Sequence, residues 1–315
     1  MLIIDSEINS LRGVLEPWFA VQYLDSENIS KETLKYSDAL IIRSTRKYGK
    51  ETLLGTNVKF IGTVTSGYEH IDTGFCEENG IFWTNAHGSN AESVAEYISA
   101  ALIAISKKTR PLNELTLGIV GVGATGGEVK KKAENFGMRL LLCDPPKNLN
   151  DNIFDADIIT LHCPLEKDTW YMVNEDFLKK MKRGAWLINA ARGAICNSEA
   201  LRYALQSKHL GGAIIDVWEN EPNIDASLLP LIEIATPHIA GHSAEAKINA
   251  ANMLVSSLGE YFNIEELKSK TLPLPQKLSN FAYSIREDDA EFRKTPRNFT
   301  EIRNKYQRKA ELNLR

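Results

Sequence analysis

Three ionisable side chains stand in the second half of this 315-residue chain, in the order cation, carboxylate, imidazole: Arg192, Glu221 and His238. A guanidinium can hold a carboxylate through two parallel hydrogen bonds and polarise an adjacent oxo group. An imidazole exchanges protons near neutral pH, and a neighbouring carboxylate can orient it and favour its charged form. Each residue alone is more commonly structural, but together they suit proton transfer at the hydroxyl of an α-hydroxy acid.

A glycine fingerprint lies upstream, at residues 121–126, after an apolar run and before a helical pattern expected over 128–136. Gly121 permits a tight turn, Gly123 lets the backbone approach a pyrophosphate, and Gly126 allows close packing of the helix on the strand. Thr125 is a candidate contact within the same loop. A glycine-rich turn without a ligand is the alternative, but the strand-to-helix context favours dinucleotide binding.

Two aspartates extend this dinucleotide hypothesis. Asp144 lies 18 residues after Gly126, where a carboxylate can accept hydrogen bonds from ribose hydroxyls and repel a 2′-phosphate. This favours NAD over NADP, although Arg139 and Lys147 nearby leave a 2′-phosphate open. Asp216 ends an apolar run and could accept a hydrogen bond from the nicotinamide carboxamide; a helix-capping aspartate is its alternative role.

Polar segments at 43–47 and 65–67 each follow a strand-like run near the start of the chain. Hydroxyls, turn N–H groups and cations at strand ends can bind an anion such as a carboxylate or a phosphate. Ser44 and Thr65 are therefore candidate substrate contacts. A solvated polar turn is the equally open alternative.

The elements that must position these residues are short apolar strands alternating with helical segments. Five such runs in the first 88 residues predict a flavodoxin-like parallel sheet, assigned to a substrate domain at 1–90: 2–4, 21–24, 39–42, 60–64 and 81–83. A helical pattern over 90–107 follows. Six further runs predict a Rossmann-like, doubly wound nucleotide domain at 91–238: 117–120, 139–143, 158–161, 185–188, 213–215 and 232–235.

Two segments depart from this alternation. Residues 145–157 contain two prolines and little helical periodicity, so we expect a loop or a single turn there. After residue 238, a segment at 239–262 contains a helix over 244–262 that we expect to pack back onto the first domain. The remainder, 263–315, carries twelve Lys and Arg against eight Asp and Glu, which is compatible with a solvated tail or a small association module.

Composition excludes several other function classes. The net charge is −4 and the pI about 6.0, so the chain lacks the basic field that attracts nucleic acid or an anionic membrane. No basic leader and no apolar run long enough to span a bilayer are visible, which favours a cytoplasmic protein. The four cysteines are widely spaced, without a zinc pattern, and are expected to be buried free thiols in a reducing compartment; no metal site is predicted.

With these residues in place, the chain resembles the D-2-hydroxyacid dehydrogenases, and most closely their erythronate-phosphate branch. The resemblance covers nearly the whole sequence, and the segments that carry it are 41–44, 62–72, 118–123, 141–146, 188–193, 216–222, 236–241 and 283–294. The paired prolines after Asp144 and the segment 283–294 are similar to that branch in particular.

The resemblance implies oxidation of 4-phospho-D-erythronate at C2 by NAD, as a step of vitamin B6 synthesis. It implies that Arg192 and Glu221 are active-site residues and that His238 exchanges the proton. The other residues it implies as contacts are, for substrate, Ser44, Thr65 and His242, and for NAD, Asp144, Cys163, Ala190, Asp216 and Gly241. It also implies a homodimer formed by a C-terminal dimerisation module, here shortened to 263–315.

Two departures from the family pattern leave alternatives open. His242 stands where the family has a substrate-contacting tyrosine, and Cys163 where it has a threonine. With the short tail, His242 supports a sister activity, such as that of a D-3-phosphoglycerate dehydrogenase. An NAD(H)-sensing binding protein, like the superfamily's transcriptional corepressors, is the alternative of another class.

Overall fold

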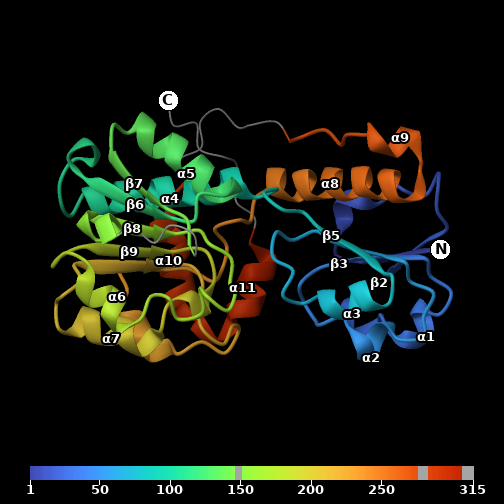
Figure 1. Cartoon of the computed structure of the whole chain (residues 1–315), viewed down its shortest axis with the longest axis horizontal. Coiled ribbons are helices and arrows are strands. Elements are labelled where there is room, and N and C mark those ends of the chain that lie inside the picture. Colours follow the sequence, from blue (N-terminus) through green and yellow to red (C-terminus); the bar gives the residue numbers. More distant parts are fainter. Residues whose placement is uncertain (146–150, 276–282, 307–315) are drawn as a thin grey trace. The chain divides into compact units, whose positions relative to one another are not determined.

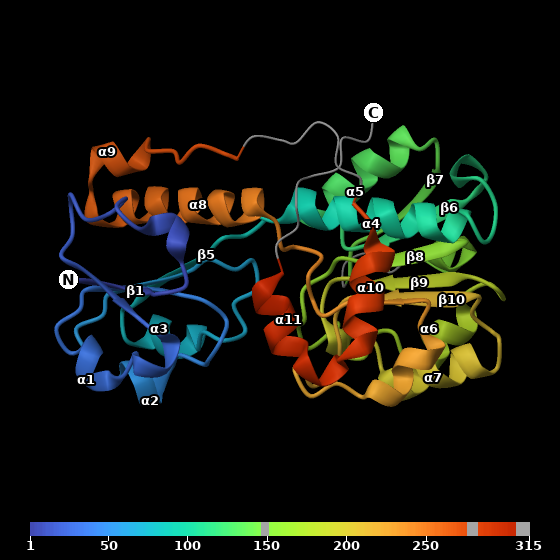
Figure 2. The same ribbon diagram turned by 180° about the vertical axis from the view of Figure 1, so that it is seen from behind.

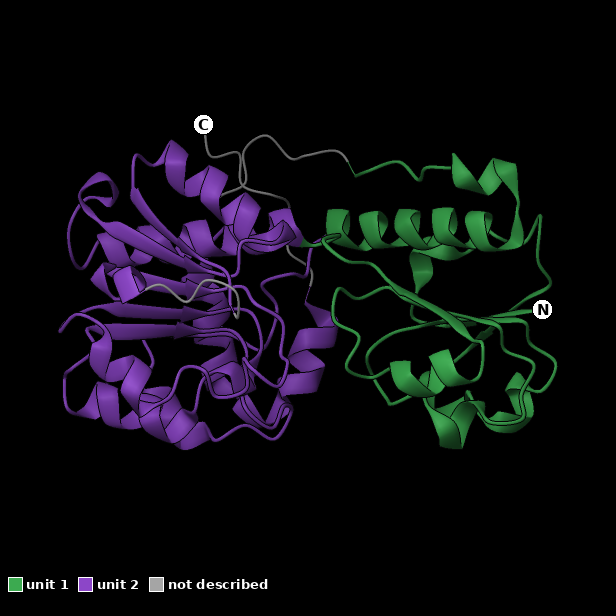
Figure 3. Ribbon diagram, in the orientation of Figure 1, with its two compact units in different colours: residues 1–90, 244–276 green, residues 91–243, 277–315 purple. Residues whose placement is uncertain are grey.

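A computed structural model describes residues 1–145, 151–275 and 283–306. The chain forms two compact units (Figure 3): residues 1–90 with 244–276, and residues 91–243 with 277–315. Residues 239–243 thus belong with the second unit and residues 263–275 with the first. The roles expected for the four segments of the sequence stay predictions.

The first unit contains one parallel sheet of five strands in the order β2-β1-β3-β4-β5 (Figure 1). This is the flavodoxin-like order expected from the sequence. The strands are β1 Leu2–Asp5, β2 Val21–Leu24, β3 Ala39–Ile42, β4 Phe60–Thr63 and β5 Phe82–Asn85.

Alternating side chains of these strands fill two separate cores. Leu2 and Ile4 face a cluster that includes Leu254 and Leu258 of helix α8, Ala244–Phe262. Ile3 faces the opposite cluster, which contains the short helices α1, Lys31–Leu34, α2, Lys50–Leu53, and α3, Thr73–Glu78. Strand residues point alternately to the two faces of the sheet. Because both faces are covered, the positions that face either side are mostly apolar and the strands read as continuous apolar runs. Helix α8 thus packs within the first unit.

The second unit contains six parallel strands in the order β11-β10-β9-β8-β6-β7. The strands are β6 Thr116–Val120, β7 Arg139–Cys143, β8 Ile158–Leu161, β9 Trp186–Asn189, β10 Gly212–Ile215 and β11 Ile234–Ala235. The chain order reverses beside β6, whose neighbours are β7 and β8. In doubly wound sheets, ligands bind beyond the carboxyl ends of the strands at such a reversal.

Helices cover both faces of this sheet. One core contains helix α4, Ala91–Ser106, and helix α5, Ala124–Asn135. The other contains α6, Glu175–Lys180, and α7, Ser198–Gln206, and it also takes in Phe292 and Phe299 of the tail. These tail residues belong to α10, Ile285–Lys294, and α11, Phe299–Lys305, which lie against this unit (Figure 2). The short helix α9, Glu265–Lys268, packs on α8 in the first unit.

Local structure agrees with the sequence in most places, and the largest difference is at the start of one helix. The helix expected over 128–136 begins earlier, at Ala124, because Gly123 already has the extended conformation of an N-cap. The described part of the segment 145–157 contains one short 3-10 helix, Asp151–Asp155, in keeping with the expected single turn; residues 146–150, which include Pro146 and Lys147, lie outside the described residues.

Three further observations concern the chain's chemistry. All four cysteines are free and buried, as expected. In the described ranges, no helix has the length and apolarity needed to cross a membrane. The same ranges contain no group of three or more His, Cys, Asp or Glu side chains that could hold a metal ion.

Candidate active site

The predicted trio comes from the carboxyl ends of three neighbouring strands in the second unit. Arg192 follows β9, Glu221 follows β10 and His238 follows β11. Backbone hydrogen bonds tie these ends together, since Asp216 donates to the carbonyl of Asn189 over 2.9 Å and His238 donates to that of Asp216 over 2.7 Å. Parallel pairing therefore brings together residues that lie 46 positions apart in the sequence.

His238 and Glu221 form a direct pair. Nδ1 of the imidazole lies 2.7 Å from Oε2 of the carboxylate. Both side chains are partly buried, with 26% of His238 and 20% of Glu221 exposed. An Nδ1–H that donates to the carboxylate leaves Nε2 as the ring atom able to exchange a proton with another group.

The environment of Glu221 keeps its carboxylate ionised. Burial alone raises the pKa of Glu221, but the charge and hydrogen bond of His238 oppose this. The backbone N–H of Trp218, which donates to Oε1 over 2.8 Å, and the positive charge of Arg303 act in the same direction. The net result is a pKa below the ordinary value, so this group remains an acceptor for the imidazole at neutral pH.

The backbone of His238 adopts the left-handed conformation, with φ at +57°. A non-glycine residue rarely occupies this region unless the surrounding structure holds it there. Here the hydrogen bond from His238 N to Asp216 provides one such constraint. Strain of this kind is typical of residues held for function.

Arg192 lies in a loop that packs against the loop carrying Glu221. A Cβ added at Gly193 would come within 2.0 Å of the backbone of Trp218, so only glycine allows this close approach. The Arg192 carbonyl accepts a hydrogen bond from Asn189, and its Nη1 donates to the carbonyl of Ala191 over 2.7 Å. Arg192 therefore lies in a loop directly beside the loop that carries Glu221.

Asp216 is buried and organises the segment around His238. Its Oδ1 accepts hydrogen bonds from the Thr236 hydroxyl and from Ile239 N, and its Oδ2 accepts one from Ala240 N. The Tyr97 hydroxyl lies 2.7 Å from that of Thr236 and extends the network into α4. Its role is thus at least structural, whereas the nicotinamide contact expected for it stays a prediction.

The glycine fingerprint has one face closed by protein and one face open. Gly121 has φ at +91°, and a Cβ there would lie 2.5 Å from the backbone N of Cys163. A Cβ at Gly126 would lie 1.9 Å from the carbonyl oxygen of Gly121. At Gly123, by contrast, a Cβ would meet nothing within 4 Å. The backbone at Gly123, which caps α5, can therefore be approached closely by a ligand.

Asp144 lies next to this loop, and its Oδ1 accepts a hydrogen bond from Val122 N over 3.0 Å. Its side chain is exposed, so the second oxygen can still accept from another group. Cys163 is buried behind Gly121, and burial raises its thiol pKa to about 12, which keeps it neutral. These positions place both residues at the fingerprint end of the sheet.

The remaining candidates of the second unit flank the same edge. Ala190 follows β9 and is partly buried, and Thr125 lies in the first turn of α5. Gly241 and His242 follow the Asp216-bound segment, and His242 N donates to the carbonyl of Ile239 over 2.9 Å. Their expected contacts with cofactor and substrate stay predictions.

Ser44 and Thr65 belong to the first unit and follow the neighbouring strands β3 and β4. Ser44 is exposed. The Thr65 hydroxyl donates to the carbonyl of Gly67 over 2.7 Å and lies 2.7 Å from the Thr63 hydroxyl. The Thr63 hydroxyl in turn is hydrogen-bonded to the His70 ring. The two candidates thus share one strand edge, and their substrate role stays a prediction.

Sequence reasoning missed the supporting residues of the site. Trp218 bonds Glu221 through its backbone and donates from Nε1 to the carbonyl of Thr236. Tyr97, Thr236 and the tail residue Asp289 complete the support of β11. For Asp289, the sequence offers one local signal, its i, i+4 spacing from Arg293 in the tail.

A family model identifies the second unit. Residues 103–240 match the D-isomer specific 2-hydroxyacid dehydrogenase, NAD binding domain. This range contains the fingerprint, Asp144 and the whole trio, so the site lies inside the matched domain.

Curated relatives extend the similarity to both units. The chain is 40% identical to the erythronate-4-phosphate dehydrogenase of Porphyromonas gingivalis, over 87% of this chain and 79% of that protein. It is 38% identical to the enzyme of the same name from Bacteroides fragilis, over 97% of this chain and 95% of that protein.

Solved structures share the fold. The D-lactate dehydrogenase of Aquifex aeolicus, complexed with NAD and lactic acid, matches with a TM-score of 0.72 and 25% identity, covering 88% of this chain and 100% of that one. The NAD⁺-bound 3-phosphoglycerate dehydrogenase of Entamoeba histolytica matches with 0.73 and 26%, covering 87% and 99%. Together with the site geometry, these similarities show that the chain belongs to the erythronate-4-phosphate dehydrogenase family of D-isomer specific 2-hydroxyacid dehydrogenases.

Proposed function

We propose that this protein oxidises 4-phospho-D-erythronate at C2 with NAD, giving 2-oxo-3-hydroxy-4-phosphobutanoate in the synthesis of pyridoxal 5′-phosphate. The observation that carries the proposal is the hydrogen-bonded pair of His238 and Glu221, whose ring nitrogen and carboxylate oxygen lie 2.7 Å apart, in a chain of this family. Glu221 follows β10, the strand next to β9, which Arg192 follows. This is the set of groups that oxidation of a 2-hydroxy acid needs.

Each member of the trio has a defined task. His238 takes the proton of the C2 hydroxyl at Nε2, because Nδ1 is engaged with Glu221. Glu221 holds the ring orientation and stabilises the imidazolium that forms. Arg192 binds the substrate carboxylate and polarises the oxygen that becomes the 2-oxo group. Bound NAD supplies the acceptor for the hydride that leaves C2.

The residues present fit NAD. The open backbone at Gly123 and the N-terminus of α5 suit a pyrophosphate, and the exposed Asp144 suits ribose hydroxyls while repelling a 2′-phosphate. We propose that the cofactor contacts also include the loop glycines and five flanking residues: Thr125, Cys163, Ala190, Asp216 and Gly241.

We assign the substrate role to the first unit, with Ser44 and Thr65 as contacts, and NAD binding to the second, which also supplies His242. A sister activity is the second candidate function, since His242 replaces a tyrosine of the family pattern. Imidazole can still bind a phosphate when it is protonated, so we keep the phosphorylated four-carbon acid as the substrate.

A substrate panel tests this assignment. Purified protein and NAD are mixed in turn with 4-phospho-D-erythronate, 3-phospho-D-glycerate and D-lactate, and NADH formation is followed. We expect kcat/KM to be at least about 100-fold higher for the first acid, because a site built to bind a phosphate strongly rejects analogues that lack it or misplace it. Replacing NAD by NADP should lower the rate in all cases.

The other outcomes are equally informative. Faster turnover of 3-phospho-D-glycerate would replace the proposal with the sister activity. NAD binding without turnover of any acid would support a sensing protein instead.

We also propose a cytoplasmic homodimer. The buried free thiols support a reducing compartment, and the family resemblance supports dimer formation. The described part of 263–315 packs on its own chain, so a dimer that uses this segment must use its outer face. Sedimentation at micromolar concentration should give twice the 35.2 kDa chain mass; a monomer would contradict the proposal.

A further inference from the structure

Helix α10 covers the free edge of the second sheet. β11 is the edge strand, and α10 packs against it. Ile285, at the start of α10, belongs to the core on one face of the sheet, and Phe292 belongs to the core on the other. The helix therefore crosses the edge from face to face, where an unpaired strand would otherwise expose its backbone.

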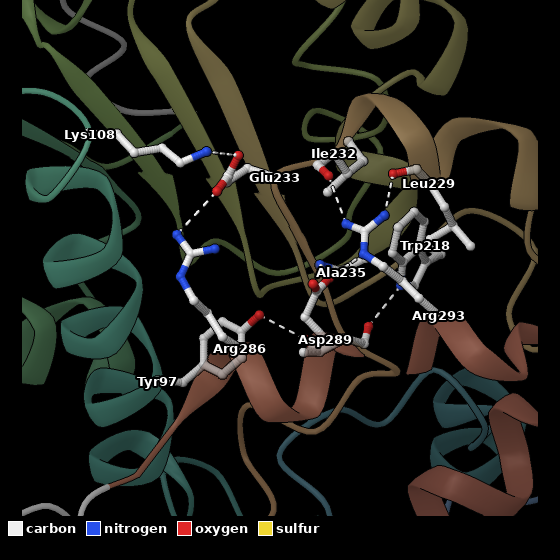
Figure 4. A network of polar contacts seen from close by, with 11 residues as sticks. Tyr97, Lys108, Trp218, Leu229, Ile232, Glu233, Ala235, Arg286, Asp289 and Arg293 are labelled. Carbon is white, nitrogen blue, oxygen red and sulfur yellow. Dashed lines mark hydrogen bonds and ion pairs between the residues drawn. The ribbon is translucent and has the colours of Figure 1, made fainter. Parts of the chain in front are cut away.

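Asp289 supplies the hydrogen-bond acceptor that a further strand would provide at this edge (Figure 4). Its Oδ1 accepts a hydrogen bond from Ala235 N over 2.7 Å and another from Nε of Arg293 over 2.7 Å. The same guanidinium donates to the carbonyls of Leu229 and Ile232, each over 2.7 Å. One carboxylate and one guanidinium thus hold both the entry to β11 and its last residue.

The bond to Ala235 lies three residues before His238 in the chain. Between them, Thr236 is fully buried and bound to Tyr97, Asp216 and the Trp218 ring nitrogen. Because Thr236 is held at both its hydroxyl and its carbonyl, we expect a displacement of Ala235 to reach His238.

The same helix also contacts the support of Glu221. The ring of Phe292 packs against that of Trp218, with centroids 6.1 Å apart. The backbone N–H of Trp218 is the donor that binds Oε1 of Glu221. α10 is therefore linked indirectly to both members of the proton-transfer pair. Asp289 binds the strand that leads to His238, and Phe292 packs on the residue that donates to Glu221.

We propose that α10 positions the His238–Glu221 pair, with Asp289, Arg293 and Phe292 as positioning residues of the catalytic unit. The inference rests on the proposed function, since it assigns a role to this segment within that reaction. It gives the tail a task in the chain's own active site, separate from subunit association.

The test compares three variants of the protein, two at Asp289 and one at Glu291. Asp289→Ala removes the acceptor of Ala235 N. Asp289→Asn keeps an oxygen in the same place and should rescue. Glu291→Ala is the matched control, because it removes an exposed carboxylate from the same helix. Where Asp289→Ala is not recovered folded, Arg293→Lys carries the test, since a lysine has one donor nitrogen in place of the three separate guanidinium nitrogens that bind Asp289 and the two carbonyls.

We expect Asp289→Ala to lower kcat about 10- to 100-fold, with the KM for NAD changed less than about twofold, because small misplacements of reacting groups have effects of this size. Asp289→Asn should recover kcat to within about threefold of wild type, and Glu291→Ala should leave it unchanged. Amide exchange in segment 234–241 should be faster in Asp289→Ala than in wild type, a readout that needs no substrate.

An unchanged kcat in Asp289→Ala would overturn the proposal. So would a loss that Asp289→Asn fails to rescue, because the acceptor of Ala235 N would then not be its cause. A loss matched by an equal loss of NAD affinity would also overturn it, because that indicates general unfolding. If wild-type protein does not turn over the phosphorylated acid, the proposed function fails; the exchange rates and the rescue on whichever acid is oxidised still decide the positioning role.

Discussion

Two histidines at the same sheet edge show how differently its two ends are built. His238 is paired with Glu221 and is about one quarter exposed. His162, after β8, lies behind Gly121, and burial without a nearby carboxylate lowers its pKa to about 3. One imidazole is prepared to exchange protons, whereas the other is kept neutral as a packing residue. The two imidazoles thus differ both in their burial and in the carboxylate partner that only His238 has.

The same contrast holds for the surrounding loops. The β10–β11 end is fixed by side chains, with Asp216 bonded through both oxygens. The glycine end is formed by backbone, closed at Gly121 and open at Gly123. Reacting groups need fixed geometry, and a cofactor needs an accessible surface. Substitutions at the two ends should therefore affect different kinetic constants.

The largest effect is expected for His238→Asn. Asparagine tolerates the positive φ of this position better than other non-glycine residues, so the backbone should remain in place. Loss of the proton acceptor should lower kcat by about 10²- to 10⁴-fold. Stopped-flow measurement of NADH formation and calorimetric titration of NAD separate the effects on rate and affinity. A weakened NAD affinity with a normal rate would reverse the assignment.

Glu221→Gln should have a smaller effect at the same end. The amide has a single oxygen, so it can accept from Trp218 N or from the imidazole but not from both, and it no longer stabilises the imidazolium that forms during the reaction. We expect kcat to fall about 10- to 100-fold with unchanged affinity for NAD. Steady-state kinetics over pH 6 to 9 check this, and a variant as fast as wild type would show that the pair has no role in catalysis.

A pair of glycine substitutions tests the other end. Gly121→Ala combines a strained φ with a backbone clash, so it should cost about 2 kcal/mol of folding free energy. Gly123→Ala meets no protein atom and should leave the melting temperature unchanged while weakening NAD binding about tenfold. Thermal unfolding and NAD titration of both variants distinguish the two roles. Equal behaviour of the two variants would remove the distinction between a closed and an open face.

The smallest effect concerns His162 and acid stability. Its pKa is about 3 in the folded protein and has the ordinary value of 6.5 in the unfolded chain, so below pH 6.5 the unfolded chain binds a proton that the folded chain does not. The contribution of neutral His162 to the free energy of unfolding is fully present above pH 6.5 and should be lost by up to about 1.4 kcal/mol for each pH unit on acidification. His162→Gln should reduce this slope in urea unfolding at pH 7, 6 and 5. The exposed His87→Gln serves as control, and identical slopes in all three proteins would refute the assignment.

Much of this arrangement was predictable from sequence because it depends on local patterns. Strands such as 139–143 and 158–161 are short apolar runs, and the glycine loop has a defined spacing. The trio follows three successive strands, so parallel pairing alone brings its members to one edge. The supporting contacts were not predictable in this way. Asp289 bonds a backbone N–H 54 positions away, and no periodicity in the sequence indicates such a pairing.

The helix at 124–135 shows a second limit. Two glycines near its start disfavour a helix by propensity, and the sequence placed its beginning at residue 128. Close packing of Gly126 on Gly121 outweighs that cost, since any side chain there would clash with the backbone. Tertiary packing, rather than local preference, sets where this helix begins.

Deuterium transfer tests the central claim most directly. Wild-type protein and His238→Asn are incubated with NAD and 4-phospho-D-erythronate deuterated at C2, and the nicotinamide product is examined by mass spectrometry. The structure predicts deuterated NADH from wild type, and from His238→Asn only a trace despite equal NAD binding. Transfer at the same rate in both proteins, or NADH without deuterium, would contradict the account. In that account His238, oriented by Glu221, takes the hydroxyl proton as the hydride leaves C2.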